Sequence, residues 1–257
     1  NLVIGTHSVF QKKILYKKLG YIIIDEQHKF GVRQRKSLSD KGGDNCDVLL
    51  MSATPIPRTL TMTIYGDMDV SIIKEKPNHR KEIITYSKLE NKTNDVLKFI
   101  NKEINKGGQV FWVCPIIEES KKIDHQSAVK KYEQLNKFFP NNVRLLHGKT
   151  PMDEKEQILD DFQKNEFKIL VSTTIIEVGI DFPNANIIII ENANKFGLSQ
   201  LHQLRGRVGR GDLQATCILL FKSNLSENAK KRIKILKNSN DGFEISEEDM
   251  KIRGFGD

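Results

Sequence analysis

Two adjacent acids, Asp25 and Glu26, directly follow the apolar run at residues 21–24. A short β-branched run that ends in acids is typical of a buried parallel strand, whose carboxyl end points at the ligand-binding edge of an α/β sheet. Successive residues of a pleated strand point in different directions, so the two carboxylates can serve different purposes. One can hold Mg²⁺ through its waters, while the other orients an attacking water. A solvated strand end is the alternative interpretation.

Two hydroxyl residues, Ser52 and Thr54, follow a second apolar run at residues 48–50. Small hydroxyls can hydrogen-bond neighbouring carboxylates without filling much space. The pattern therefore predicts that Ser52 and Thr54 sense the state of the two acids from an adjacent strand. An ordinary turn stabilised by its own hydroxyls is the alternative.

Three arginines, at 205, 207 and 210, alternate with glycines in the segment 203–211. Arginine forks can stabilise the charge that spreads over a transferring γ-phosphoryl group. A basic loop that only binds nucleic acid is the competing interpretation. Upstream, the hydroxyls of residues 172–174 could contact phosphates, and Asp181 could accept from a ribose hydroxyl.

A phosphate-cradling P-loop is missing from these 257 residues. Residues 147–150 end like one, but Val143 stands where the pattern GxxxxGK[ST] requires glycine before Gly148. Near the start, Thr6 and His7 could touch a DNA backbone, with a strand-end turn as the alternative.

Strand and helix patterns alternate along the chain, which predicts an α/β fold with parallel sheets and right-handed crossovers. Apolar spacing predicts a helix around residues 96–104, and Thr150 is a candidate N-cap for a helix that opens with Pro151. The predicted strands are 21–25, 47–51, 109–114, 143–147, 168–172, 186–191 and 215–221.

The elements divide into three regions. Residues 1–78 are too short for a complete nucleotide-binding domain, whereas 79–222 are long enough, and a polar, proline-containing stretch near residue 78 separates them. Residues 223–257 predict a basic helix, a turn at 240–242 and an acidic helix around 246–252. Since the chain lacks an initiator Met, we expect a piece of a longer protein.

Bulk composition suits a globular protein with a polyanion partner. The chain carries 41 Lys and Arg against 33 Asp and Glu, a net charge of +8. A solvated lysine-rich surface would give the same balance. The three cysteines form no CxxC pair, which argues against a zinc site or a disulfide framework and fits a reducing compartment. The apolar runs are too short to span a bilayer.

Taken together, these segments resemble the RecG family of superfamily 2 DNA helicases. Residues 25–32 resemble the family's DEQHRFGV, with Lys29 where arginine is usual, and residues 51–60 resemble motif III. Further along the chain, the resemblance covers motif IV at 112–120, motif V at 172–181, motif VI at 200–211 and a translocation motif at 240–254. It implies two RecA-like parallel-sheet domains, the first one incomplete, followed by a short C-terminal helical translocation motif.

The resemblance also implies residue roles. Asp25 would bind Mg²⁺ through water and Glu26 would polarise the attacking water. Arg207 and Arg210 would reach the γ-phosphate, with Arg210 as the finger. The nucleotide-lining candidates are Gly179 and Asp181; the coupling candidates are Gln27, His28, Ser52, Thr54 and Gln203; the DNA-side candidates are Thr6, His7, Thr173 and Arg253.

The implied activity is ATP- and Mg²⁺-dependent movement on branched or forked DNA by a monomer in the bacterial cytoplasm, near the nucleoid and away from membranes. A single-stranded DNA-binding protein is a further candidate partner. We expect little ATPase from the 257 residues alone, because the phosphate cradle is missing. Two alternatives stay open: a translocase of the Mfd type, which Gln27-His28 and His202-Gln203 disfavour, and a truncated product that only binds DNA.

Overall fold

The structure, a computed structural model, divides into two compact units, residues 1–56 and 57–257, and each is described by itself. The predicted domain boundary at residue 78 lies outside the described residues. The described residues are 2–11, 13–26, 41–42, 46–52, 69–73, 75, 81–115, 121–173 and 182–253.

The first unit contains a short 3-10 helix, η1 (His7–Phe10), and two parallel strands, β1 (Tyr21–Ile24) and β2 (Asp47–Leu50). Both strands were predicted, each one residue longer. One face of the pair is buried, since Ile22 and Ile24 pack against Val48 and Leu50. Tyr21 and Ile23 on the other face are each 54% exposed, although parallel sheets are usually covered on both faces.

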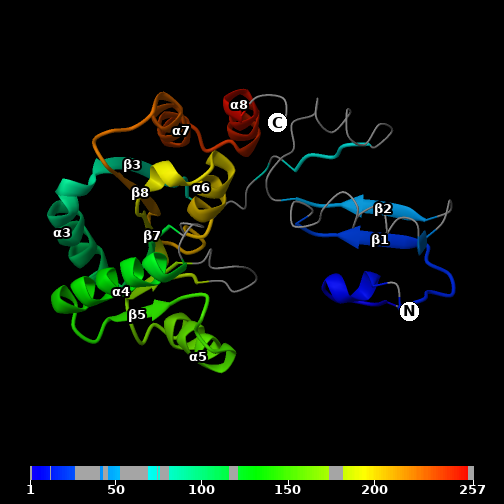
Figure 1. The fold of residues 1–257 in the computed structure, drawn as a ribbon, viewed down its shortest axis with the longest axis horizontal. Helices are drawn as coiled ribbons and strands as arrows, with labels where there is room; N and C mark the ends of the chain where they lie inside the picture. The colour runs from blue at the N-terminus through cyan, green and yellow to red at the C-terminus, as the bar shows by residue number, and fades with distance from the viewer. Residues whose placement is uncertain are drawn as a thin grey trace. The chain divides into compact units, whose positions relative to one another are not determined.

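The second unit is built on a six-stranded sheet in which every pair is parallel, as the alternation of strands and helices predicted. Its spatial order is β3 (Ile84–Leu89), β8 (Thr216–Phe221), β7 (Ala185–Ile190), β4 (Gln109–Val113), β6 (Ile169–Ser172) and β5 (Val143–Leu146). Figure 1 labels β3, β8, β7 and β5 of this sheet. Sequence patterns missed β3, an edge strand that has polar residues on both sides of its pleat.

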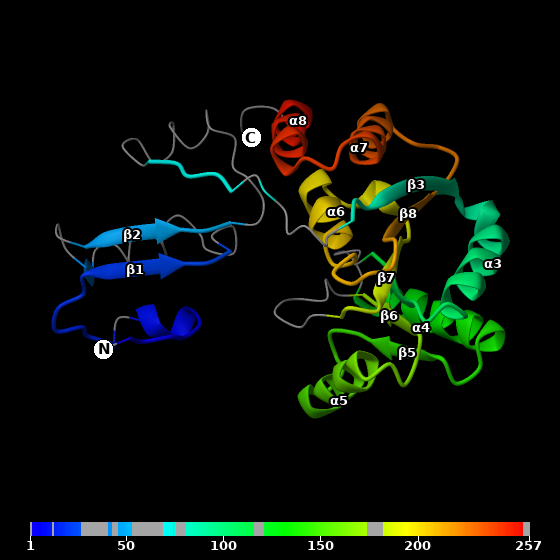
Figure 2. The same ribbon diagram turned by 180° about the vertical axis from the view of Figure 1, so that it is seen from behind.

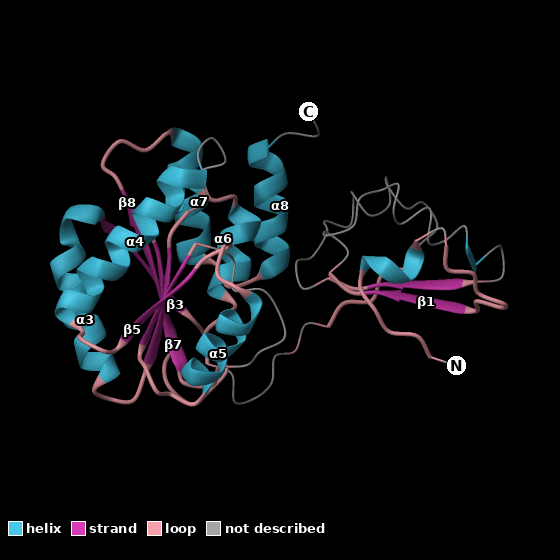
Figure 3. Cartoon of the chain, turned by 60° about the horizontal axis from the view of Figure 1, so that its bottom comes forward, coloured by secondary structure: helices cyan, strands magenta, loops and turns pink. Residues whose placement is uncertain are grey.

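Helices cover both faces of this sheet (Figures 2 and 3). One face carries α3 (Thr93–Ile104) and α4 (Lys121–Phe138). The other carries α5 (Met152–Gln163), α6 (Leu198–Arg205), α7 (Glu227–Asn238) and α8 (Gly242–Arg253). Alternate strand residues feed separate cores: Trp112 joins the α3–α4 side, whereas Phe111 and Val113 join the other. The central strands are therefore buried on both faces, which fits their near-continuous apolar sequence.

Local predictions for α3 and α5 differ in outcome. The apolar face of α3 is buried as expected, through Val96, Leu97 and Ile100. Thr150, however, does not cap α5, because the helix begins at Met152 after Pro151 and shows no side-chain cap hydrogen bond. The Thr150 hydroxyl instead accepts from the backbone N–H of His147 at 3.1 Å, closing the preceding turn. None of the helices in the described part of the chain is long and apolar enough to cross a bilayer.

Candidate functional site

The paired acids lie just past the end of β1. Asp25 is exposed, and its Oδ1 accepts a hydrogen bond from the Glu26 backbone N–H at 2.8 Å. Glu26 has a φ of 50°, in the left-handed region that non-glycine residues rarely occupy. β1 ends at Ile24, so a turn after the strand, and not the strand pleat on which the prediction relied, sets the directions of the two side chains. Such local strain is common where a side chain must point in a particular direction.

The hydroxyl segment lies beside these acids, as predicted. β2 pairs with β1, and the Met51 N–H donates to the Ile24 carbonyl at 2.8 Å, which extends the pairing beyond both strands. Ser52, the next residue, is half-buried. The chain thus brings Asp25, Glu26 and Ser52 to one edge of the first unit. Three further candidates, Gln27, His28 and Thr54, lie outside the described residues.

The first of the three arginines is structural. Arg205 ends α6 with only 2% of its surface exposed. Its guanidinium donates to the carbonyls of Leu236 at 2.6 Å and Ser239 at 2.8 Å, and lies 3.0 Å from His202 Nδ1. The carbonyls of a last helical turn have no partner within the helix, so Arg205 supplies one to the end of α7. Burial lowers the pKa of this guanidinium below its ordinary value.

The other two arginines, Arg207 and Arg210, are half-buried and follow α6 in a tight loop. Gly209 in this loop has a φ of 81°, and a Cβ there would lie 2.8 Å from the Ala215 side chain. Its N–H donates at 3.3 Å to the carbonyl of Ala185, the first residue of β7. The glycine therefore holds the arginine loop against the amino end of the sheet.

The DNA-side candidates lie elsewhere. Thr173 follows β6 at the opposite, carboxyl end of the sheet, where it is 8% exposed and its N–H donates to the Leu146 carbonyl at 3.3 Å. In the first unit, Thr6 is exposed and precedes η1, which His7 begins. The last DNA-side candidate, Arg253, ends α8. The coupling candidate Gln203 is half-buried on α6. The nucleotide-lining candidates Gly179 and Asp181 lie outside the described residues.

The C-terminal helices are tied to α6. The Ser199 hydroxyl donates to Asp249 Oδ2 at 2.6 Å, joining α6 to α8. Asp241 Oδ1 accepts from the Phe243 N–H at 2.8 Å, so the predicted turn also caps α8. This explains why α8 begins at Gly242 rather than near 246. The segment that resembles the translocation motif is therefore in direct contact with the helix that leads into the arginines.

Sequence reasoning missed Glu191, the residue that follows β7. Its carboxylate forms a salt bridge with Lys131 at 2.7 Å and accepts from the Cys114 thiol at 3.3 Å. The sequence did contain a pattern that could have identified it, because Glu191 directly follows the apolar run 187–190 just as Asp25 follows the run 21–24. Within the described ranges, no group of three or more His, Cys, Asp or Glu side chains is arranged to hold a metal ion.

Two family descriptions match the chain. Residues 1–63 match a DEAD/DEAH box helicase and residues 91–212 match a helicase conserved C-terminal domain.

Curated relatives extend the similarity to the whole chain. It is 50% identical over 259 residues to the ATP-dependent DNA helicase RecG of Bacillus subtilis, covering 100% of this chain and 38% of the relative. It is 45% identical over 261 residues to the protein of the same name from Escherichia coli K12, again covering 100% of this chain and 38% of the relative. The chain thus spans well under half the length of these relatives.

Solved structures agree with this similarity. A structure of RecG bound to a three-way DNA junction matches with a TM-score of 0.75 and 44% identity, covering 98% of this chain and 32% of that one. The Saccharomyces cerevisiae protein Dbp5, bound to RNA and ADP BeF3, matches with a TM-score of 0.64 and 18% identity, covering 96% of this chain and 66% of that one. The second likeness shows a shared fold only. Both units are accordingly parts of RecA-like helicase domains.

Proposed function

This chain is homologous, along its whole length, to ATP-dependent DNA helicases of the RecG family, and from that premise we propose that it is the C-terminal motor segment of a translocase that uses ATP to remodel branched DNA. We place such a protein near the nucleoid. The observation that carries the proposal is the similarity along the whole of this chain. It is supported by the residue types, since the paired acids of the first unit and the arginines of the second are the groups that phosphoryl transfer requires.

On the first unit, Asp25 is the proposed magnesium partner. Its carboxylate is exposed, and only one of its oxygens has a hydrogen-bond partner among the described residues. A single carboxylate of this kind fits Mg²⁺, which keeps several waters and takes its other ligands from substrate phosphates. When bound, the ion would neutralise charge on the phosphates. Glu26, turned by its left-handed backbone, would orient the attacking water.

On the second unit, Arg207 and Arg210 would contact the transferring phosphoryl group, with Arg210 as the finger. The loop that carries them is held to the sheet by Gly209, so the two guanidinium groups start from a fixed backbone. Preorganised donors of this kind stabilise developing charge without reorganising during the reaction. Gly179 and Asp181 remain proposed nucleotide contacts.

The coupling candidates are proposed to link the nucleotide site to DNA. Ser52 and Thr54, with Gln27 and His28, would report the state of the acids to the rest of the first unit. In the second unit, α6 carries Gln203, leads into the arginines and contacts α8 through Ser199 and Asp249. We propose that α6 passes a change at the arginine loop, caused by ATP binding or hydrolysis, to the C-terminal helices.

The DNA-side residues would act mainly on the phosphate backbone. Thr6, His7, Thr173 and Arg253 are the proposed contacts, and the net charge of +8 favours a polyanion. Binding should therefore depend little on sequence and should weaken steeply as salt is raised.

The first experiment measures ATP hydrolysis with forked DNA, linear duplex or no DNA, for the 257-residue chain and for the longer protein that carries it. We expect the chain to be inactive and the longer protein to be most active with forks. In the longer protein, Glu26→Gln should abolish turnover but preserve ATP binding, and Arg210→Ala should lower the turnover rate. DNA-stimulated hydrolysis by the chain itself would refute our interpretation of the missing cradle. Full activity of the Glu26→Gln protein would refute the role of Glu26.

A further inference from the structure

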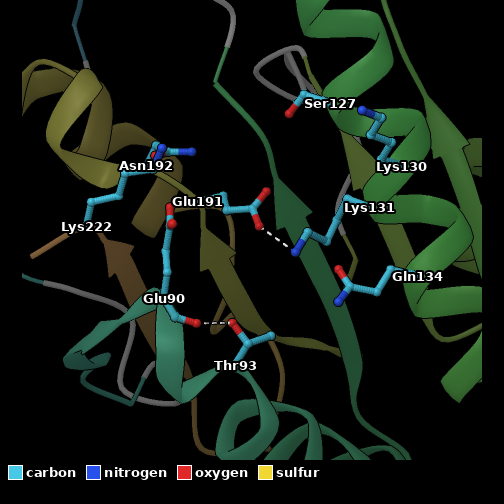
Figure 4. Close-up of a pocket in the computed structure, with 9 residues that line it drawn as sticks. All are labelled: Glu90, Thr93, Ser127, Lys130, Lys131, Gln134, Glu191, Asn192 and Lys222. Carbon is cyan, nitrogen blue, oxygen red and sulfur yellow. Dashed lines mark hydrogen bonds and ion pairs between the residues drawn. The ribbon is translucent and has the colours of Figure 1, made fainter.

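A polar hollow of about 510 Å³ opens at the carboxyl edge of the six-stranded sheet (Figure 4). The arginine loop contacts the opposite, amino edge. Its floor comes from residues that directly follow strands: Glu90 after β3, Glu191 and Asn192 after β7, and Lys222 after β8. Its wall comes from the helices of one face, through Thr93 of α3 and Ser127, Lys130, Lys131 and Gln134 of α4. A volume of this size is within the range of small-ligand sites.

The topology of the sheet marks this place independently. β4 and β7 are neighbours, but the chain leaves β4 for α4 on one face and leaves β7 for α6 on the other. In open α/β sheets, ligands bind in the crevice outside the strand ends where the direction of winding reverses in this way. Glu191 and Asn192 stand at that point, and Asn192 adopts a left-handed backbone with a φ of 47°.

The central acid of the hollow is already neutralised. Glu191 is paired with Lys131 at 2.7 Å, and both side chains are mostly buried. Its other carboxylate oxygen accepts from the Cys114 thiol. Burial, followed by the nearby Glu191 charge, raises the pKa of Cys114, so the thiol keeps its proton and remains a donor. Glu191 therefore does not repel an anion from the hollow.

The donors that remain have no partner in the part of the chain that the structure describes. They are the ammonium groups of Lys130 and Lys222, the amides of Gln134 and Asn192, and the hydroxyl of Ser127. Figure 4 draws Lys130 and Gln134 on the α4 side, facing Asn192 and Lys222 across the opening. Glu90 is the one lining acid that no cation among the described residues pairs with. The uncommitted charge is thus two cations against one anion.

We propose that this hollow binds a phosphate group, either a phosphodiester of a nucleic-acid strand or the phosphates of a small free ligand. Lys130 and Lys222 would supply the charge, and the amides and the Ser127 hydroxyl would supply neutral hydrogen bonds. The site is separate from the proposed ATP site, because the arginine loop meets the amino end of β7, a strand of 6 residues. That strand length corresponds to roughly 20 Å. Where the phosphate belongs to a strand, the inference deepens the DNA-binding part of the proposed function.

The chain carries its own probe of this site. Trp112 is its single tryptophan, is fully buried, and has the Lys131 ammonium 5.0 Å from its ring centroid. A phosphate that attracts the lysines will change the field on the indole, so tryptophan emission should respond to binding. We would titrate the 257-residue chain, without ATP, with sodium tripolyphosphate and separately with a 12-nucleotide oligothymidylate.

We expect a saturable change in emission with at least one probe. The double variant Lys130→Gln/Lys222→Gln should weaken that binding about tenfold, on the order of 1.4 kcal/mol. With the oligonucleotide, it should also lower the salt slope by about 1.4, the value for two phosphate contacts on a single strand. Glu90→Gln should strengthen binding, because it removes the uncompensated acid.

The matched control is Lys137→Gln/Lys234→Gln, which removes two exposed lysines of α4 and α7 that do not line the hollow. Saturation by tripolyphosphate would assign a small phosphorylated ligand, whereas a response to the oligonucleotide alone would assign the nucleic-acid backbone. Silence with both probes would overturn the proposal, and so would equal weakening by the control pair. Because no hydrolysis is measured, failure here is distinguishable from failure of the proposed motor function.

Discussion

Replacing Arg205 by methionine should destabilise the second unit by about 2–4 kcal/mol. Methionine keeps much of the side-chain volume but removes the donors that reach the carbonyls of Leu236 and Ser239 at 2.6 and 2.8 Å. Each buried polar group left without a partner costs about 1–3 kcal/mol. Part of that loss is offset, because the variant no longer has to keep a charge out of water.

The measurement is equilibrium urea unfolding at pH 7, followed by far-ultraviolet circular dichroism. With an m-value on the order of 2–3 kcal/mol per molar, the midpoint should fall by about 1 M while the slope stays unchanged. Amide hydrogen exchange adds a local test, since protection should be lost first at the end of α7 and the start of α8.

Arg210→Met is the control, because Arg210 is only half-buried, whereas Arg205 is buried. It should cost less than about 1 kcal/mol. An Arg205→Met protein within about 0.5 kcal/mol of the parent chain, or one that loses exchange protection uniformly, would refute the assignment of Arg205 as the anchor of α7.

Three further predictions concern single positions. Gly209→Ala should destabilise the second unit by about 1–3 kcal/mol, because φ is 81° and the new Cβ would lie 2.8 Å from Ala215. Gly206→Ala, whose Cβ would meet its nearest atom at 3.4 Å, is the tolerated control in the same thermal unfolding assay. Burial raises the pKa of the Cys217 thiol from 9.0 to about 12. Between these two pH values the unfolded chain loses the thiol proton while the folded chain keeps it, so the free energy of unfolding should fall as pH rises from 9.0 to about 12. In urea unfolding at several pH values, Cys217→Val should remove a slope of about 1.4 kcal/mol per pH unit, and an unchanged slope would contradict the burial argument. Glu26→Gly should stabilise the first unit by about 1 kcal/mol, since glycine adopts a φ of 50° without strain. In the longer protein the same change should abolish ATP turnover. Glu26→Ala should also abolish turnover, but it should not stabilise the first unit.

The fold was largely readable from the sequence, because the central strands are apolar runs and the helices between them have clear apolar faces. β3 escaped detection for a physical reason. As an edge strand it alternates exposed Ile84 and Tyr86 with buried Thr85, so its apolar side chains mark the outer face and no continuous apolar run is present. Its identity as a strand depends on pairing with β8, which lies more than a hundred residues away in the sequence.

The candidate site was predicted by residue type but not by geometry. Arg205, Arg207 and Arg210 look alike in sequence, yet the first is buried and the other two are not. The spacing of Arg205 from Leu198 and Leu201 on α6 indicated that Arg205 would be buried, since these positions share one helical face. The left-handed backbone of Glu26 had no comparable signal, because no glycine or asparagine marks the turn. The Glu191 cluster also depended on packing, which brings together strand ends far apart in the chain.

The hydrogen bonds from Arg205 on α6 to the end of α7 limit how this architecture can be inherited. The helicase family match ends at residue 212, but the acceptors of the Arg205 guanidinium lie at Leu236 and Ser239, beyond it. A recombination event that joined this domain to a different C-terminal tail would leave a buried cation facing no carbonyls. Only tails whose first helix ends over α6 could be accepted, so the conserved domain and the helices that follow it must be exchanged together or altered together. In evolutionary terms, the unit of inheritance is longer than the stretch that matches the helicase C-terminal domain.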